Sequence, residues 1–479
     1  LREFVADGGL PTGTETMLVV RDTGLDLRHR FSADPLDLLA ALDAATDGSG
    51  SGHQRQRERR QALASVLGAD DFDRALRAAD LYAGQQGLEA RLSVRHLETL
   101  VDSLAGLDGR KGLLYVGADL PMFAGQELFL ALENLPEPLP GQRPGQATTW
   151  SLKHDASRLY TELAARANTA GVTFYTLDAG GRRSPLGSDV ETFSWTPVTG
   201  LDREVADNET RPLHLLAQVT GGFAITGQDR IEGELARLSG EISGAYSLAY
   251  APPVDGIGEK HQLRVEVKRP GLRVRHRDSY RHQPASERLA GAVLAALDVG
   301  VAANPGGLRL SFATPRQDGG HLVLPVRLAI PYDRLVLAPS GSLYVTQLDL
   351  VVGAQDRDGD RSPLAEAEVA VEIPASSAAD VRGDYVVTVS LRVNPGEHRV
   401  AVGVRDEITG IESVVVGNAD VPGRPLQNRT MAAREERRQS VPGAEMLAGE
   451  RPLRLTRDHS YVLPRDPFPT GLRSLGDDG

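Results

Sequence analysis

Two apolar runs separated by a helical pattern constrain the fold of this chain more than any other feature. Residues 111–116 (KGLLYV) and 172–177 (VTFYTL) are short and rich in apolar side chains, and the helical pattern of residues 157–170 stops at Gly171. Such runs are typical of buried strands. A strand, a helix and a second strand in this order predict a mostly parallel sheet that helices cover on both faces.

The neighbouring segments continue this alternation. An apolar run over 17–22 turns at Thr23-Gly24 into the alternating residues 25–31, which predicts a hairpin. A helix then begins at Pro35, behind Asp34 as its N-cap. Further helices are predicted over 61–107, 213–219 and 229–243, and a short edge strand over 222–226. Residues 47–60 predict a Gly/Ser-rich loop that runs into a charged helix start, and loops are predicted over 133–152 and 179–208.

The pattern changes after residue 246 and predicts a second, all-β part. Residues 246–250, 262–268 and 272–276 alternate like antiparallel strands, and residues 285–298 form an alanine-rich helix. From 308 to 421, short strands recur between turn signals, as in an immunoglobulin-like β-sandwich. We therefore predict an α/β domain over 1–282, a linker helix over 283–303, a β-sandwich over 304–423 and an extended tail over 424–479.

Charge and composition exclude several classes of function. The net charge of −12 opposes nucleic-acid binding, which depends on Lys and Arg at phosphates. It gives no reason to expect attraction to an anionic membrane. The chain has no cysteine, which excludes disulfides, thiolate metal sites and cysteine nucleophiles. No run of about 18 apolar residues occurs, so no transmembrane segment is expected.

Four stretches, in this order, resemble the acidobacterial-type von Willebrand factor A-like (VWFA-related) domain family. They are LREFVADGGLPTGTETMLVVRDTGLDLRHRFSADPLDLLAAL, then LDGRKGLLYVGADLPM, then LAARANTAGVTFYTLDA, and finally LLAQVTGGFAIT with SGAYSLAYAPP and LRVEVKRPGLRVRHRDSY. Together they cover roughly residues 1–282. The resemblance implies a Rossmann-like sheet whose first, central strand would lie upstream of Leu1. An unpaired core edge is costly, so we predict that residues 1–282 alone do not fold stably.

The resemblance also implies where a metal would bind. The family's D-x-S-x-S ligands would lie before Leu1, and its middle-loop Thr has only Thr46 and Ser49 as guesses. At the third ligand position this chain has Ala118, with Asp119 one residue later. We therefore expect no metal, cofactor or catalytic residue, and Mg²⁺ would bind only if an upstream motif exists.

Other motifs have ordinary structural interpretations. Residues 356–360 (DRDGD) lack the glycine and glutamate positions of an EF-hand and predict a hairpin turn. The integrin-type tripeptide 382–384 (RGD) is explained by a strand entry. His96 and His214 lie in helical patterns, and residues 57–60 (RERR) predict a solvated helix face. No serine-hydrolase, zinc-protease or P-loop motif occurs.

The favoured function is therefore non-enzymatic. We expect an extracytoplasmic protein-binding, adhesion or scaffold protein whose partner the sequence does not identify, with a degenerate metal-dependent adhesion site. The recognition face is predicted at the carboxyl end of the sheet, in loops 117–123 and 178–183. Two alternatives stay open: a hydrolase that uses the sandwich as an accessory module, and a non-functional gene fragment.

Overall fold

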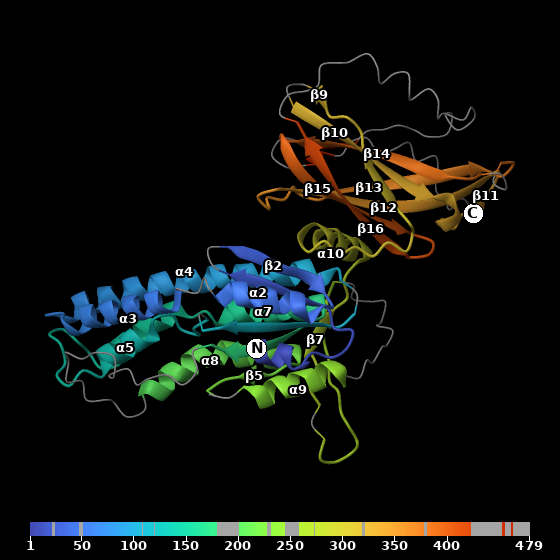
Figure 1. The fold of residues 1–479 in the computed structure, drawn as a ribbon. Helices are drawn as coiled ribbons and strands as arrows, with labels where there is room; N and C mark the ends of the chain where they lie inside the picture. The colour runs from blue at the N-terminus through green and yellow to red at the C-terminus, as the bar shows by residue number, and fades with distance from the viewer. Residues whose placement is uncertain are drawn as a thin grey trace, which may run out of the picture. The chain divides into compact units, whose positions relative to one another are not determined.

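The computed structural model describes residues 1–21, 24–46, 51–107, 109–118, 120–179, 201–227, 231–244, 258–272, 274–318, 321–377, 381–422, 453–455 and 461–462. The chain divides into two compact units, with the boundary between Gln283 and Pro284. The first unit mixes helices and strands, and the second is mostly β (Figure 1). The predicted order of an α/β part followed by a β part is confirmed.

The first unit contains a parallel sheet in the order β3-β4-β5. Its strands are β3 (Lys111–Gly117), β4 (Val172–Asp178) and β5 (Ala224–Ile225). Leu113 and Phe174 on one face pack with α4 (Phe72–Ala105), α7 (Ser157–Ala170) and α8 (Leu201–Thr220). Leu114 and Tyr175 on the other face pack with α1 (Arg2–Ala6) and α9 (Glu232–Ser243). Because side chains alternate along a strand, both faces are apolar and need a helical cover.

A hairpin lies on the same core but belongs to a separate sheet. Strands β1 (Thr16–Arg21) and β2 (Leu25–Ser32) pair with each other, and α2 (Pro35–Thr46) follows. Met17 and Phe31 pack against the core that contains Leu113. Among the described residues, β1 pairs only with β2 and β3 pairs only with β4. Each of these strands therefore has one edge without a described strand partner.

A helical subdomain extends the first unit beyond this sheet. It consists of α3 (Ser51–Leu67), the amino-terminal half of α4, α5 (Gln126–Glu133), α6 (Gln146–Ser151) and η1 (Leu152–His154). Its core is built around Phe72, Phe129 and Leu128. Asp71 caps α4 by accepting a hydrogen bond from the Arg74 backbone N–H at 2.8 Å, as an N-cap residue should.

Several boundaries predicted from the sequence are wrong. The loop predicted over 47–60 is helical from Ser51, and the loop predicted over 133–152 contains α6 and η1. The helix predicted over 213–219, after a loop over 179–208, begins at Leu201 and runs through Pro212. The tertiary contacts of the first half of α8 override the local proline signal.

The strands predicted over 262–268 and 272–276 are also wrong. Only β6 (Lys260–Gln262) and β7 (Ser279–Arg281) pair there. The other described residues of these two segments are not in strands. Among the described residues no sheet lies beside the alternating sequence to take up its hydrogen bonds, so the ladder stops near its base. The strand predicted over 246–250 lies outside the described residues.

The second unit consists of two facing sheets. One contains β8 (Arg309–Phe312), β9 (Arg316–Asp318), β10 (His321–Pro331), β14 (Asp384–Val393), β17 (Leu453–Leu455) and β18 (Tyr461–Val462). The other contains β11 (Ala338–Ser340), β12 (Leu343–Asp356), β13 (Ala365–Pro374), β15 (Gly396–Asp406) and β16 (Glu412–Val421). Val326 of β10, Leu350 of β12 and Val402 of β15 belong to the core between the two sheets.

The helix that was expected to be a linker packs on this sandwich. Helix α10 (Ala285–Asp298) covers the outer face of the β12–β15 sheet, where Val293 contacts the core residues Val351 and Ala401. A Cβ at Gly403 would lie 2.7 Å from Val293 Cγ2. Glycine therefore allows the helix to approach the sheet closely.

Candidate binding surfaces

The structure turns much of the predicted recognition loop inward. Gly117 and Ala118 at the end of β3 are half-buried. Leu120 is 1% exposed and Met122 is 9% exposed. The described part of the loop therefore contributes to the core and offers little surface to a partner.

Asn208 of α8 fixes this loop from the side. It is buried, and its Oδ1 accepts a hydrogen bond from the Phe123 N–H at 2.7 Å while its Nδ2 donates to the Phe123 carbonyl at 2.9 Å. The Tyr160 hydroxyl adds a hydrogen bond to the Pro121 carbonyl at 2.8 Å. These contacts satisfy backbone groups that burial would otherwise leave unpaired.

The expected metal positions are only partly described. Ala118 at the end of β3 is half-buried, whereas Asp119 and Ser49 lie outside the described residues, as does the side chain of Thr46. Of the second predicted recognition loop, 178–183, only Asp178, which is buried, and Ala179 are described. Within the part of the chain that the structure describes, no three His, Cys, Asp or Glu side chains gather as metal ligands. The described residues therefore contain no candidate metal site.

The predicted turn over residues 356–360 is confirmed. Asp356 Oδ1 accepts hydrogen bonds from the backbone N–H groups of Asp358 at 3.0 Å and Asp360 at 2.9 Å. This carboxylate thus organises its own turn. The tripeptide at 382–384 enters β14, where the Asp384 carboxylate is paired with Arg309.

The two histidines of the helical patterns have structural surroundings. His214 Nε2 lies 3.3 Å from Thr226 Oγ1, which links α8 to the residue after β5. Burial, followed by the charges of Arg21 and Arg95, lowers the pKa of His96. His96 is therefore neutral at pH 7 and has no charge to offer a ligand.

The basic run on α3 is not entirely a solvated face. Arg59 Nε lies 3.7 Å from the carboxylate of Glu127, which is buried in α5. The Tyr82 hydroxyl donates to the same carboxylate at 3.4 Å. Arg59 therefore compensates a buried charge inside the helical subdomain, and no sequence spacing signals this pairing.

Tyr82 makes a pH-dependent contribution to stability. Burial, reinforced by the Glu127 charge, raises the pKa of the Tyr82 phenol far above its usual range. In the unfolded chain the phenol ionises at about pH 10. The contribution of Tyr82 to the free energy of unfolding is therefore present below that pH and is lost as the pH rises above it. Between pH 9 and pH 11, we expect wild type to lose more unfolding free energy than Tyr82→Phe in urea titrations. Equal losses would contradict this.

A second cluster joins α6 and η1 to α4. Asp80 Oδ1 accepts a hydrogen bond from Trp150 Nε1 at 3.0 Å and lies 2.9 Å from His154 Nε2. Burial opposes ionisation of Asp80, but the hydrogen bonds from His154 and Trp150 outweigh it and lower the pKa of this carboxyl. Asp80 and Trp150 are 70 positions apart, so sequence analysis missed the cluster.

Sequence analysis also missed an exposed leucine face on α4. Leu81, Leu88 and Leu92 are 68%, 54% and 41% exposed. At 100° per residue, positions i, i+7 and i+11 point within about 20° of one direction. Gly84 and Gln85 between them are exposed as well. The periodicity could have identified this face, but it was hidden behind the stronger pattern of the buried side of α4.

The pKa values of the described carboxyl groups offer little support for a catalytic function. Among the groups that the structure describes, Glu407 is the carboxyl whose pKa is raised, through burial and then the neighbouring charge of Asp349. Two acidic residues with raised pKa in one cleft would support the hydrolase alternative. The described residues do not supply that pair.

Comparisons with known proteins identify no family. No protein-family model matches the chain, and no curated protein matches it. A β-glucuronidase structure from Bacteroides uniformis is 14% identical over 24% of this chain and 13% of that chain, with a TM-score of 0.17. A structural-genomics target named SoR45 is 11% identical over 27% of this chain and 96% of that chain, also with a TM-score of 0.17. Likenesses at this level carry no argument about function.

The helices of the described residues do not include a membrane span. None of them combines the length and the apolar character needed to cross a bilayer.

Proposed function

We propose that this chain is a non-enzymatic protein-binding or scaffold protein that acts outside the cytoplasm. The observation that carries the binding role is the leucine face of α4, formed by Leu81, Leu88 and Leu92. Aligned exposed apolar side chains mark interaction sites, whereas scattered ones do not. The extracytoplasmic location rests on the family resemblance alone.

We further propose that the first unit is an incomplete VWFA-type domain and the second an immunoglobulin-like sandwich. The parallel β3-β4-β5 sheet has helices on both faces, and the β1–β2 hairpin shares its core. A further strand between β1 and β3 would pair both edges that have no described partner. It would join the hairpin and the sheet into one layer, as the resemblance implies.

The leucine face suits a helix or a flat apolar surface of another protein. From Leu81 to Leu92 it runs about 16 Å along α4. Gly84 adds no side chain in the middle, and nothing lies within 4 Å of where its Cβ would be. Fully burying an exposed leucine side chain contributes about 1.5–3 kcal/mol. Since these three leucines are already partly buried and association itself is costly, we propose that they form the apolar centre of a larger interface.

Photo-crosslinking of the full chain tests this role. A photoreactive residue replaces Gln85 in the middle of the leucine face, and a control places it at the exposed Glu366 of β13. In extracts of the source organism, we expect a specific adduct at position 85, loss of that adduct in Leu88→Gln, and retention in Leu36→Gln. Leu36 is 70% exposed and lies on α2. An adduct with the mass of two chains identifies the partner as a second copy.

Two outcomes contradict the proposal. One is the absence of any adduct at position 85 above the level at position 366. The other is an adduct whose yield is the same in Leu88→Gln as in wild type.

A further inference from the structure

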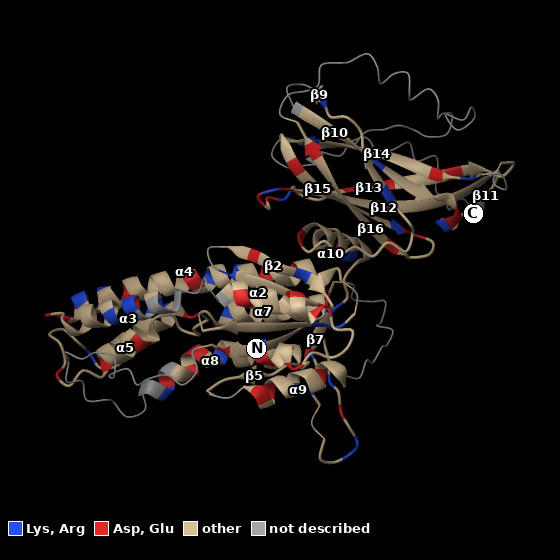
Figure 2. Cartoon of the chain, viewed as in Figure 1, with Lys and Arg blue, Asp and Glu red and all other residues tan. Residues whose placement is uncertain are grey.

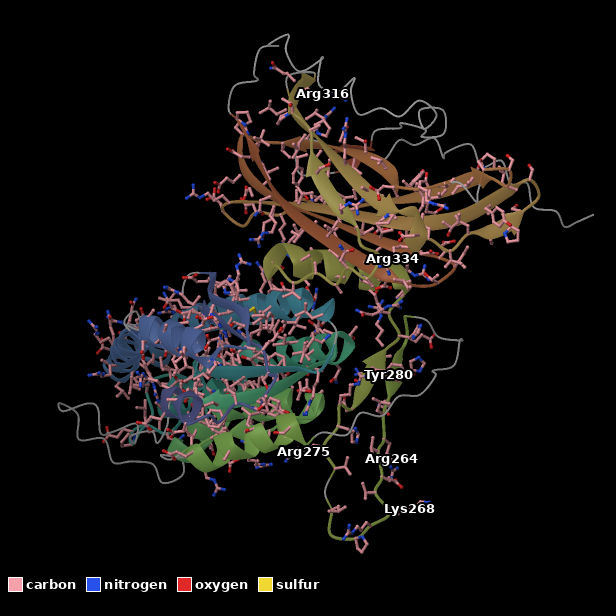
Figure 3. The ribbon with its side chains drawn as sticks, turned by 45° about the vertical axis from the view of Figure 1, so that its right-hand side comes forward. Arg264, Lys268, Arg275, Tyr280, Arg316 and Arg334 are labelled. Atoms are coloured by element: carbon pink, nitrogen blue, oxygen red, sulfur yellow. The ribbon has the colours of Figure 1, made fainter. Side chains whose placement is uncertain are left out.

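Residues 258–282 form an arm that extends from the first unit. Its base is fixed: the Leu263 N–H donates to the Asp278 carbonyl at 2.7 Å, and the rings of His261 and Tyr280 stack at 5.0 Å. Asn168 of α7 donates to the Asp278 carboxylate at 2.8 Å. Figure 3 shows Lys268 at the end of the arm far from Tyr280. The arm is therefore anchored at one end and exposed at the other.

The arm concentrates positive charge in an acidic protein. Residues 258–282 contain eight Lys or Arg and three Asp or Glu, a net charge of +5, whereas the whole chain has −12. Some of these charges are used internally: Arg264 pairs with Glu266 at 2.7 Å, and Arg275 pairs with Glu241. Lys268 and Arg269 are exposed at the tip. Figure 2 shows basic residues at this end of the arm.

Apolar side chains flank these two cations. Val267 is 45% exposed and Leu272 is 59% exposed. Between them, Pro270 and Gly271 form the turn, with Gly271 at φ 81°. The tip thus combines two aliphatic side chains and two basic ones within the six residues 267–272.

We propose that the tip of this arm binds an anionic lipid surface. The aliphatic side chains suit the boundary between headgroups and acyl chains, and Lys268 and Arg269 suit anionic headgroups beside it. Single-stranded nucleic acid is a poorer fit, because it binds by stacking on aromatic side chains. The arm has no Phe, Tyr or Trp between residues 262 and 279.

The acidic remainder of the protein does not prevent this contact. Six extended residues from Leu263 to Lys268 span about 20 Å. This exceeds the Debye length of about 8 Å at physiological salt. The net charge of −12 on the whole chain therefore does not predict how an anionic membrane interacts with the tip alone.

Vesicle co-sedimentation of the full chain tests the proposal. The probes are phosphatidylcholine vesicles with and without about 30% phosphatidylglycerol, which supplies the negative surface potential that attracts basic segments. We expect binding to the anionic vesicles that weakens as salt increases. The double variant Lys268→Glu/Arg269→Glu should bind at least about 25-fold more weakly, since each basic residue contributes about fivefold.

Further variants separate the lipid from other anionic partners. Val267→Ser/Leu272→Ser should lower vesicle binding several-fold, whereas Arg158→Glu, which changes an arginine whose side chain is 88% exposed on α7, should not. Absence of binding to anionic vesicles overturns the proposal. So does vesicle binding that the apolar double variant leaves unchanged, or tighter binding to a DNA duplex or an acidic peptide. None of these outcomes bears on the leucine face of α4.

Discussion

Replacing Gly222 with alanine is expected to destabilise the first unit by about 3 kcal/mol or to prevent its folding. A Cβ on Gly222 would lie 1.9 Å from the Phe174 carbonyl oxygen and 3.2 Å from Thr173 Cγ2. The carbonyl belongs to the backbone of β4, so it cannot rotate away as a side chain would. The chain after α8 must therefore separate from β4 to accept one methyl group.

The same change elsewhere provides the control. Gly240 lies within α9, and nothing is within 4 Å of the position of its Cβ. Gly240→Ala should stabilise the helix by about 0.5–1 kcal/mol. Urea titrations followed by circular dichroism measure both variants. If Gly222→Ala and wild type have the same midpoint of urea unfolding, the packing of α8 and β5 against β4 is not as described.

Asn208→Ala is expected to cost about 3 kcal/mol of unfolding free energy. The side chain is 2% exposed, and it satisfies both the N–H and the carbonyl of Phe123. Alanine would leave the Phe123 N–H without this acceptor, and an unsatisfied buried group costs about 1–3 kcal/mol. The Phe123 carbonyl would lose one hydrogen bond, worth about 1 kcal/mol, but would keep the one from the Gln126 N–H at 3.3 Å. The loss should be largest for the loop after β3, because this clamp fixes it to α8.

Two comparisons sharpen this prediction. Asn208→Asp keeps an acceptor for the Phe123 N–H, but it places a carboxylate oxygen against the Phe123 carbonyl and buries a charge, so it should cost at least as much as alanine. Asn134 is exposed and donates to the Leu130 carbonyl at 2.8 Å, and Asn134→Ala should cost less than about 0.5 kcal/mol. Equal effects of Asn208→Ala and Asn134→Ala would show that the clamp is not formed in solution.

The elements with strong local signals could be predicted from the sequence. The strand over 172–177, the helix over 157–170 with its stop at Gly171, and the helix over 285–298 are where the pattern places them. Gly171 has φ 67°, which is the left-handed geometry that ends a helix. These features depend on a few neighbouring residues, so the sequence alone determines them.

The errors occur where long-range contacts decide. Residues 262–268 alternate like a strand, but no neighbouring sheet in the described residues completes the ladder. The loop at 117–123 was expected at the surface, yet Asn208 and Tyr160 hold it inward across 85 and 39 residues. A net charge likewise cannot reveal that basic residues gather on one arm. The leucine face of α4 and the tip of the arm both have local signals, helical spacing and a contiguous basic run, but only the structure shows that these residues are exposed.

The proposed VWFA-type fold, and the extracytoplasmic location inferred with it, depend on the edges of β1 and β3 that have no partner among the described residues. Hydrogen–deuterium exchange of the full chain tests this most directly, by comparing the amides of β3 with those of β4. Since β4 pairs with a strand on each side and β3 with one, we predict that β4 exchanges at least about tenfold more slowly. Equal protection of the two strands would mean that β3 already has a second strand partner, which would contradict the account.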